Sequence, residues 1–293
     1  MHDIPKEKNI EHIFISEENC IRFLFEDNIL NNYDKCMQCN IGNIKIYDYA
    51  PKQWRCTNYN CLKAVSIFKD SFFSKSKVKC NDLMRICYKW LAGQKYNDIL
   101  IQTQHSSKLI SWTTRFCREL VAKNVTEEAN IIGGPGIIVE VDESKFGKVK
   151  YGHGHWVEGV WILGAVERTL ERKVLLKAVS NRNRETLMTI LGSHIAAGSI
   201  IHSDLWRGYF GMEEYLNVTH KTVKHSENFK DPDTGVHTNT IEGTWCGVKY
   251  KIAPRNRTKE VIDDHLAEFI WRRQNAGKLW KSFLTCLRDT KYI

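Results

Sequence analysis

The apolar and polar positions follow two different periodicities in successive parts of the chain. In residues 80–123 the apolar positions recur three and four residues apart, the spacing that places them on one side of an α-helix. From residue 137 onward, short β-branched runs alternate with further helical stretches. The pattern predicts a helical segment followed by a mixed α/β segment, and Gly133–Gly136 marks the boundary between them.

Three helices are expected in the helical segment. The first starts near Asn81 or Asp82 and ends at Gly93, the second covers residues 96–103, and the third begins at residue 106 or 107. The apolar stripe expected on the third helix comprises Leu109, Trp112, Phe116 and Leu120. The cations that fall off this stripe, where DNA phosphates can be met, are Lys108, Arg115 and Arg118. This order of helices is the outline of a helix-turn-helix, although any small helical bundle gives a similar pattern.

The α/β segment is expected to begin with three strands and to continue with alternating helices and strands. The predicted strands are Ile137–Asp142, Trp156–Val166, Arg172–Val179 and Ser199–Asp204. The predicted helices are Asn183–His194, a helix opened by Thr240–Trp245, and Val261–Gln274. A hairpin set followed by crossovers predicts a mixed α/β sheet with helices packed on it.

Positive charge is concentrated in two blocks. The 293 residues include 43 Lys and Arg against 34 Asp and Glu, a net charge of +9. Residues 62–126 carry +8 and residues 242–293 carry +5, whereas residues 127–241 carry −2. Such blocks indicate a nucleic acid or another anionic partner, and the alternative is a solvated face rich in lysine.

The composition excludes several classes of protein. With 42% hydrophobic residues, five prolines and no low-complexity tract, a mostly disordered chain is excluded. No apolar run approaches the length of about 18–20 residues that a membrane span needs, so no membrane partner is expected. The N-terminus lacks the layout of a secretory signal, and we therefore expect an intracellular protein of about two domains.

Four of the ten cysteines form two closely spaced pairs. Cys36 and Cys39 are followed, after an arm long enough for a hairpin, by Cys56 and Cys61. Two short chelating loops joined in this way are typical of a structural zinc site of four thiolates, the zinc ribbon. The alternative is four free thiols in a small core, and the other six cysteines are expected to be packed thiols.

Three carboxylates in the α/β segment stand at positions where active sites form. Asp142 and Asp204 each end a predicted strand, and Glu242 lies in the first turn of a predicted helix. Hard oxygen ligands of this kind suit Mg²⁺ or Mn²⁺. Two such ions about 4 Å apart can drive phosphoryl transfer.

Each of these acids also has a structural alternative. Asp142 can simply lead into a loop, and Glu140 on the same strand face competes for its role. Asp204 can cap the segment that follows it. Glu242 stands three residues after Asn239, the spacing of a capping box.

Five segments together resemble a known family of enzymes. They are Val139–Phe146, Gly152–Val157, Trp161–Arg168, Ser203–Tyr209 and Asn239–Trp245. Over about residues 130–275 they resemble the DDE transposases of the Merlin superfamily, which are similar to bacterial insertion-sequence transposases with the same domain. The most specific parts are the Ser203-Asp204 and Asn239-x-x-Glu242 segments.

The resemblance implies a ribonuclease H-like fold and a cut-and-paste DNA transposase that depends on two Mg²⁺ or Mn²⁺ ions. Asp142, Asp204 and Glu242 would be its metal-binding triad and its catalytic residues. Asn239 matches a polar position of the last motif, and His202 can touch substrate or pack at the end of its strand. The cations expected to hold DNA beside the third acid are Lys249, Lys251, Arg255 and Arg257.

The expected organisation has four parts. They are an N-terminal segment (1–35), a zinc ribbon (36–61), a helix-turn-helix-like DNA-binding domain (62–130) and a ribonuclease H-like DDE catalytic domain (131–293). The expected partners are double-stranded DNA, as transposon ends and as target, and further copies of the chain in a synaptic complex. The expected location is the nucleus of a eukaryote, or the nucleoid or cytoplasm of a bacterium. Two alternative functions are a domesticated DNA-binding regulator without catalysis and a ribonuclease H-like nuclease.

Overall fold

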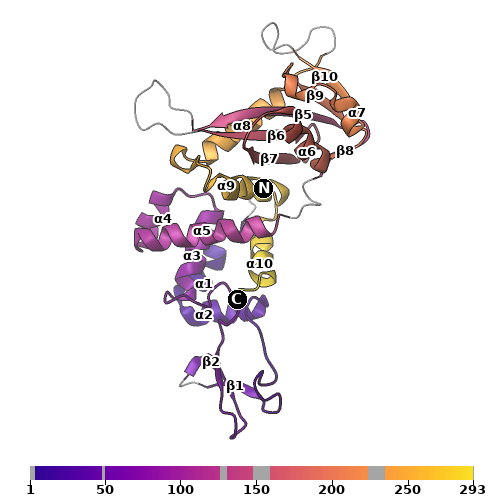
Figure 1. Ribbon diagram of the computed structural model, residues 1–293. Helices are drawn as coiled ribbons and strands as arrows, with labels where there is room; N and C mark the ends of the chain where they lie inside the picture. Colours follow the sequence, from indigo (N-terminus) through magenta and orange to yellow (C-terminus); the bar gives the residue numbers. More distant parts are fainter. Residues whose placement is uncertain (1–3, 48–49, 126–130, 148–158, 224–234, 293) are drawn as a thin grey trace. The chain divides into compact units, whose positions relative to one another are not determined.

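The computed structural model describes residues 4–47, 50–125, 131–147, 159–223 and 235–292 (Figure 1). Its contacts divide the chain into two compact units, residues 1–120 with 275–293 and residues 121–274. The C-terminal residues, expected in the catalytic domain, therefore belong to the first unit. The physical reason is that α10 (Leu279–Asp289) packs against α3 (Cys80–Leu91), where the rings of Phe283 and Trp90 lie 6.0 Å apart.

The paired cysteines of the first unit are carried by a small antiparallel sheet. Its strands β1 (Ile44–Tyr47), β2 (Ala50–Cys56) and β3 (Ala64–Ser66) lie in that order. The hairpin predicted between the two cysteine pairs is thus confirmed. Trp54 on β2 is packed edge-on against Phe25 and Tyr33, which anchors the sheet to the residues before it.

Two helices precede the sheet. They are α1 (Glu7–Ile15) and α2 (Glu17–Glu26), and Ser16 between them caps α2 by accepting the Asn19 amide at 3.2 Å. Both helices pack against α3. Lys52 of β2 donates to Glu17 at 2.6 Å.

Three helices follow the sheet at the positions predicted from the sequence. They are α3, α4 (Tyr96–Thr103) and α5 (Ser107–Lys123). The predicted inward face of α3 is buried. Gln104 ends α4 in the left-handed conformation, with φ 55°, and so makes the sharp turn into α5.

The predicted apolar stripe of α5 is wrong at its centre. Trp112 and Phe116 are 55% and 51% exposed. The buried face of α5 instead comprises Ile110, Thr113, Thr114, Cys117, Leu120 and Val121. Both faces of this helix carry apolar residues at helical spacing, so periodicity alone could not choose between them. The smaller side chains lie inward because they let α5 approach α3 closely, with the Cys117 and Cys87 sulfurs 3.4 Å apart.

A five-stranded mixed sheet forms the centre of the second unit (Figure 1). In sheet order its strands are β10 (Thr219–Thr222), β9 (Ile200–Ser203), β5 (Ile138–Phe146), β6 (Val160–Glu167) and β7 (Val174–Val179). β5, β6 and β7 form an antiparallel meander, whereas β9 is parallel to both β5 and β10. The prediction of a mixed α/β sheet is confirmed. Residues 156–158 of the second predicted strand lie outside the described residues.

Helices cover both faces of this sheet. One face packs against α6 (Arg184–His194), the 3-10 turn η2 (Arg207–Tyr209) and α7 (Met212–Leu216). The other face packs against α8 (Asn239–Lys251) and α9 (Ile262–Gln274). The remaining elements are the short parallel pair β4 (Ile132–Gly133) and β8 (Ile195–Ala196), and the 3-10 turn η3 (Pro254–Asn256).

Alternation along β5 assigns its side chains to these two faces. Val139 and Val141 lie in the core with α6, whereas Phe146 lies in the core with α8 and α9. Glu140 and Asp142 share the face of Phe146, because side chains two residues apart in a strand point the same way. None of the described helices is long and apolar enough to cross a membrane.

Candidate catalytic and metal sites

Asp142 and Asp204 belong to neighbouring strands, with Asp142 in the middle of β5 and Asp204 directly after the last residue of β9. The expectation that Asp142 ends its strand is wrong, because β5 stays paired with β6 as far as Phe146. In the parallel pair of β5 and β9, Glu140 is opposite His202. This is the last pair between the two strands, and Asp142 and Asp204 each follow it by two residues. Neighbouring strands are about 4.8 Å apart. Strand pairing thus joins two segments whose acids are separated by 62 positions in sequence.

Asp142 is held by a neighbouring indole. Its Oδ2 accepts a hydrogen bond of 2.9 Å from the Nε1 of Trp245 on α8. Gly164 of β6 is directly opposite Asp142 in the sheet, and a Cβ on this glycine would lie 2.5 Å from two ring carbons of Trp245. The bare backbone of Gly164 therefore makes room for the ring that binds Asp142.

Asp204 is fixed by the turn that follows its strand. Its Oδ1 accepts the backbone amide of Trp206 at 3.0 Å, an Asx turn that explains the bend after β9. The residue thus shapes a turn, while η2 begins three residues later, at Arg207. Its second oxygen receives no hydrogen bond from the described residues, so it remains available to a ligand.

Glu242 stands exposed in the first turn of α8. The capping box expected from Asn239 and Glu242 is wrong: the cap residue is Thr238, and no side chain of the helix caps it. The amides of Thr240 and Ile241 at the start of α8 donate to the Glu140 carboxylate instead. Among the described residues, the three acids do not bring one oxygen each within 4.8 Å of one another.

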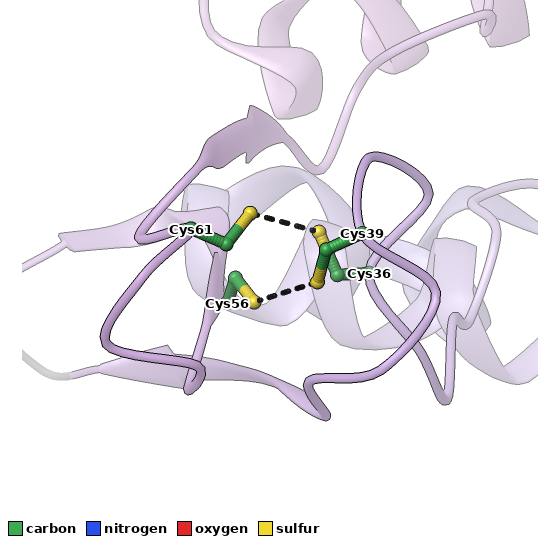
Figure 2. Close-up of side chains that lie close together, drawn as sticks. All are labelled: Cys36, Cys39, Cys56 and Cys61. Carbon is green, nitrogen blue, oxygen red and sulfur yellow. Dashed lines mark hydrogen bonds between the residues drawn. The ribbon is translucent and has the colours of Figure 1, made fainter.

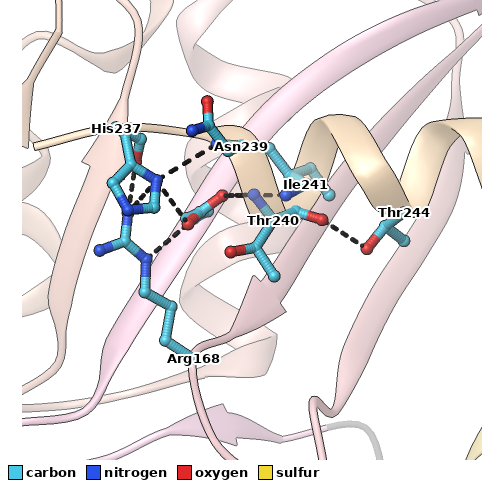
Figure 3. Close-up of polar contacts among 7 residues, drawn as sticks. Arg168, His237, Asn239, Thr240, Ile241 and Thr244 are labelled. Carbon is cyan, nitrogen blue, oxygen red and sulfur yellow. Dashed lines mark hydrogen bonds and ion pairs between the residues drawn. The ribbon is translucent and has the colours of Figure 1, made fainter. Parts of the chain in front are cut away.

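Glu140 is completely buried and binds the start of α8. Figure 3 shows Thr240 and Ile241 in the first turn of this helix, with His237 and Arg168 nearby. The Oε2 of Glu140 accepts the amides of Thr240 and Ile241 at 2.7 and 2.9 Å. Its Oε1 pairs with Arg168, which also donates to the ring and the carbonyl of His237. This full set of partners makes Glu140 a structural acid and removes it as a competitor of Asp142.

Glu143 is a nearby acid that the sequence analysis did not single out. It accepts a hydrogen bond from the buried hydroxyl of Tyr209 and lies 3.8 Å from Arg182. Burial, with the negative charges of Asp142 and Asp204 adding to it, raises the pKa of Glu143 to about 7. A carboxyl of this kind is half protonated near neutral pH, and it lies on the face of β5 opposite to Asp142.

Arg182 is stacked between two indoles. Its guanidinium lies 3.7 Å from the ring centre of Trp161 and 4.6 Å from that of Trp206. The Trp206 indole donates back to the Arg182 carbonyl at 3.3 Å. The stack places a fixed positive charge next to Glu143 and the Asp204 turn.

His202 and Asn239 occupy different environments. His202 is buried, and desolvation lowers the pKa of His202 to about 4, so the ring is neutral at pH 7. This placement favours the packed interpretation of His202. Asn239 is exposed at the first position of α8, and its amide approaches the His237 ring at 3.4 Å.

Four cysteine sulfurs converge in the first unit (Figure 2). The Sγ atoms of Cys36 and Cys61 are 3.8 Å apart, those of Cys39 and Cys56 are 3.7 Å apart, and all four lie within 4.8 Å. A tetrahedral ion with metal–sulfur bonds of about 2.3 Å requires sulfurs about 3.8 Å apart. The four sulfurs therefore have the geometry of a tetrahedral metal site.

Backbone amides favour the thiolate form in the first pair of cysteines, whereas burial raises the pKa of Cys56 in the second pair to about 12. The amides of Gly42 and Ile41 lower the pKa of Cys39 to about 6, and amides also lower the pKa of Cys36. A Cβ on Gly42 would lie 2.5 Å from the Cys56 sulfur. Only glycine lets this loop approach the second pair of cysteines.

Comparison with known families gives the second unit its class. Residues 133–274 match the model of the ISXO2-like transposase domain. The chain carries an ISXO2-like transposase domain. This match confirms the expectation of a DDE-type DNA transposase. Of the two similar groups named in the sequence analysis, it supports the bacterial insertion-sequence type. No curated protein matches the chain significantly.

Solved structures give distant likenesses. A strand transfer complex of Mos1 covers 75% of this chain and 81% of its own at 13% identity, with a TM-score of 0.30. A pre-cleavage Mos1 transpososome has the same coverage and identity at a TM-score of 0.27. A Mos1 paired-end complex with the left transposon end shares 12% identity over 74% of this chain and 81% of its own, at a TM-score of 0.28. At such low TM-scores, these likenesses carry no argument.

The cations after Glu242 in the transposase domain have different surroundings. Lys251 and Arg255 are exposed, and the exposed Lys249 has its ammonium 5.4 Å from the Phe146 ring centre. Arg257 is partly buried and donates to the carbonyls of Ile252 and Lys249, where it caps the C-terminus of α8. Arg257 thus has a structural task in addition to any DNA contact.

The raised pKa of Glu143 predicts a pH dependence of stability. A folded pKa of about 7 against an ordinary value of 4.5 means that folding favours the protonated form. The contribution of Glu143 to the free energy of unfolding is therefore fully present below pH 4.5 and is lost as the pH rises through 7. Relative to Glu143→Gln, the wild type should lose about 3 kcal/mol of unfolding free energy between pH 4.5 and 8. Urea unfolding without added divalent metal measures this, and parallel curves for the two proteins would contradict it.

Proposed function

We propose that the transposase domain cleaves and joins DNA strands with Asp142, Asp204 and Glu242 as its catalytic, metal-binding triad. The proposal is carried by the parallel pairing of β5 with β9, whose last pair lies two residues before both Asp142 and Asp204. It is supported by the packing of α8, the helix of Glu242, on the same face as Asp142. An open oxygen on Asp204 and an exposed Glu242 suit hard cations that also contact phosphate.

The finer fold assignment is ribonuclease H-like. An antiparallel meander of β5, β6 and β7 is extended at β5 by two parallel strands, and helices cover both faces. This arrangement supports the fold that the family resemblance implies. Its α8, which carries Glu242, packs on β5, the strand that carries Asp142 and pairs with β9.

The chemistry divides between the ions and the chain. When bound, two Mg²⁺ or Mn²⁺ ions supply Lewis-acid activation and charge neutralisation for phosphoryl transfer. The three carboxylates hold these ions, and the exposed Lys249, Lys251 and Arg255 bind the DNA backbone beside the scissile phosphate. Cleavage frees a 3′-hydroxyl at a transposon end, which then attacks target DNA in the same site. Synapsis of two ends calls for a homo-oligomer of the chain.

The triad is tested on DNA that carries the inverted repeats flanking the coding sequence. Asp142→Asn, Asp204→Asn and Glu242→Gln should each reduce cleavage and joining at least about a thousandfold, which is about 4 kcal/mol of transition-state stabilisation. Gel assays with Mg²⁺ or Mn²⁺ measure both steps. Glu171→Gln, an exposed acid in the turn after β6, is the control and should match the wild type.

Retained activity in any of the three variants would refute its place in the triad. Efficient hydrolysis without any joining would favour the ribonuclease H-like nuclease. A mobility-shift assay accompanies these reactions, because the variants should still bind DNA.

We further propose that the four cysteines bind a structural zinc ion as a zinc ribbon. The sulfur spacings support a tetrahedral ion, and the amide-lowered pKa values of Cys36 and Cys39 support thiolate ligands. Because the small three-stranded sheet buries little apolar surface, the ion would stabilise it directly.

Zinc content tests this ribbon. Cys56→Ser should lose the ion, which elemental analysis would find at one per chain in the wild type, and should lower the melting temperature of the ribbon. Cys246→Ser is the matched control, because Cys246 is the exposed cysteine of α8. Equal zinc in both variants would rule the site out.

α3, α4 and α5 are proposed to bind DNA as a helix-turn-helix. The net charge of +8 over residues 62–126 supports this, as does the tight turn at Gln104. On the exposed face of α5, the Lys108 ammonium lies 4.6 Å from the Trp112 ring centre, and Arg115 pairs with Glu119 at 2.7 Å. Arg118 is half-buried on the same helix.

Salt dependence of DNA affinity tests this interface. Lys108→Ala and Arg118→Ala should weaken binding on all sequences, each reducing the slope of log K against log salt by about 1. Arg115→Ala should have a smaller effect, because Glu119 already neutralises that cation. Lys69→Ala is the control in the same basic block, since Lys69 faces Asp70. Unchanged slopes for Lys108 and Arg118 would remove α5 from the DNA interface.

A further inference from the structure

The helix that carries Glu242 is attached to the strand that carries Asp142 at two points. One attachment is made by the backbone amides of Thr240 and Ile241, the two residues directly before Glu242. The other lies three residues after it, at the indole of Trp245. Both attachments end on β5, at Glu140 and Asp142. Glu242 is therefore bracketed by contacts to a single strand.

The first attachment is a buried charge pairing with a helix terminus. Glu140 has no exposed surface. Its Oε1 accepts from Arg168, and its Oε2 accepts from the first amides of α8. A carboxylate at this point satisfies amides that no helical carbonyl can reach and complements the helix dipole. The first turn of α8 is thus fixed in both position and direction.

The second attachment fixes the rotation of the helix. Trp245 is buried, its ring lies over Gly164 and meets Phe146 edge-on at 6.0 Å, and its Nε1 binds Asp142. A rigid ring held on two sides cannot swing without moving α8. Because Glu242 precedes Trp245 by one turn, the indole determines where the Glu242 side chain can reach.

From this geometry we infer that Glu140 and Trp245 are positioning residues of the transposase. They hold α8 on β5 and so fix the position of Glu242 relative to Asp142. The inference rests on the proposed triad. The oxygens of Glu140 are already paired and an indole is not a ligand for Mg²⁺ or Mn²⁺, so both residues would act through the placement of Glu242 and, for Trp245, through the orientation of the Asp142 carboxylate.

Metal affinity tests the inference independently of DNA cleavage. The probe is Mn²⁺, titrated calorimetrically into the full chain as purified. The variants are Glu140→Gln and Trp245→Phe, which preserve side-chain volume approximately. The matched control is Glu167→Gln, because Glu167 is also a buried acid of this sheet that accepts two hydrogen bonds, from Gly133 and Thr169, but none from α8.

Each positioning variant should weaken Mn²⁺ binding at least about tenfold, the usual effect of removing a partner that orients a metal ligand. Strand cleavage by Trp245→Phe should recover at high Mn²⁺, whereas cleavage by Glu242→Gln should not. Hydrogen exchange at Thr240 and Ile241 should accelerate in Glu140→Gln. Glu167→Gln should bind Mn²⁺ like the wild type.

Wild-type Mn²⁺ affinity in Trp245→Phe, with weakened binding in Glu242→Gln, would overturn the inference and leave the triad in place. Wild-type affinity in both Asp142→Asn and Glu242→Gln would overturn the triad and the inference with it. Equal weakening in Glu167→Gln would show a general loss of sheet stability and would also overturn the inference. Should Glu140→Gln not fold, Trp245→Phe alone decides, since it keeps an aromatic ring over Gly164.

Discussion

The catalytic side of the second unit depends on the pairing of one buried carboxylate. Glu140 lies in the middle of the sheet with no exposed surface, and a charge there is tolerated only when every partner is supplied. Arg168 supplies the opposite charge, and the first amides of α8 supply the remaining donors. Strand and helix satisfy each other, because the helix start needs an acceptor and the buried acid needs donors. The helix that carries Glu242 can therefore dock in one way only.

The acids along β5 serve different purposes because of where alternation places them. Glu140 and Asp142 point toward α8, where Glu140 is buried and fully paired and Asp142 is partly exposed. Glu143 points to the opposite face, where Tyr209 and Arg182 hold it and burial raises its pKa to about 7. Three carboxylates within four residues are thus a structural anchor, a proposed metal ligand and a proton-binding group.

Much of the architecture could be predicted from the chain alone. The spacing of apolar residues located α3, α4 and every strand of the five-stranded sheet except β10, and the cysteine pairs predicted the hairpin that carries them. Periodicity failed on α5, where both faces are apolar and the packing against α3 chose the smaller side chains. It also failed at Asn239 and Glu242, because a capping acceptor 99 positions before Asn239 replaced the local one. Glu143 was missed because its burial depends on Tyr209 and Arg182, which are distant in sequence.

The sequence by itself determined the chemical inventory: four cysteines at chelating spacing, acids at strand and helix ends, two basic blocks and the motifs of a transposase domain. Local patterns of this kind follow from covalent spacing and element period, so they need no knowledge of the fold. Only the tertiary structure decided which acid is paired and which is open, and which face of α5 meets solvent. Those outcomes depend on strand register, on the bare backbone of Gly164 beneath Trp245 and on buried charge pairing, all of which join residues far apart in the chain.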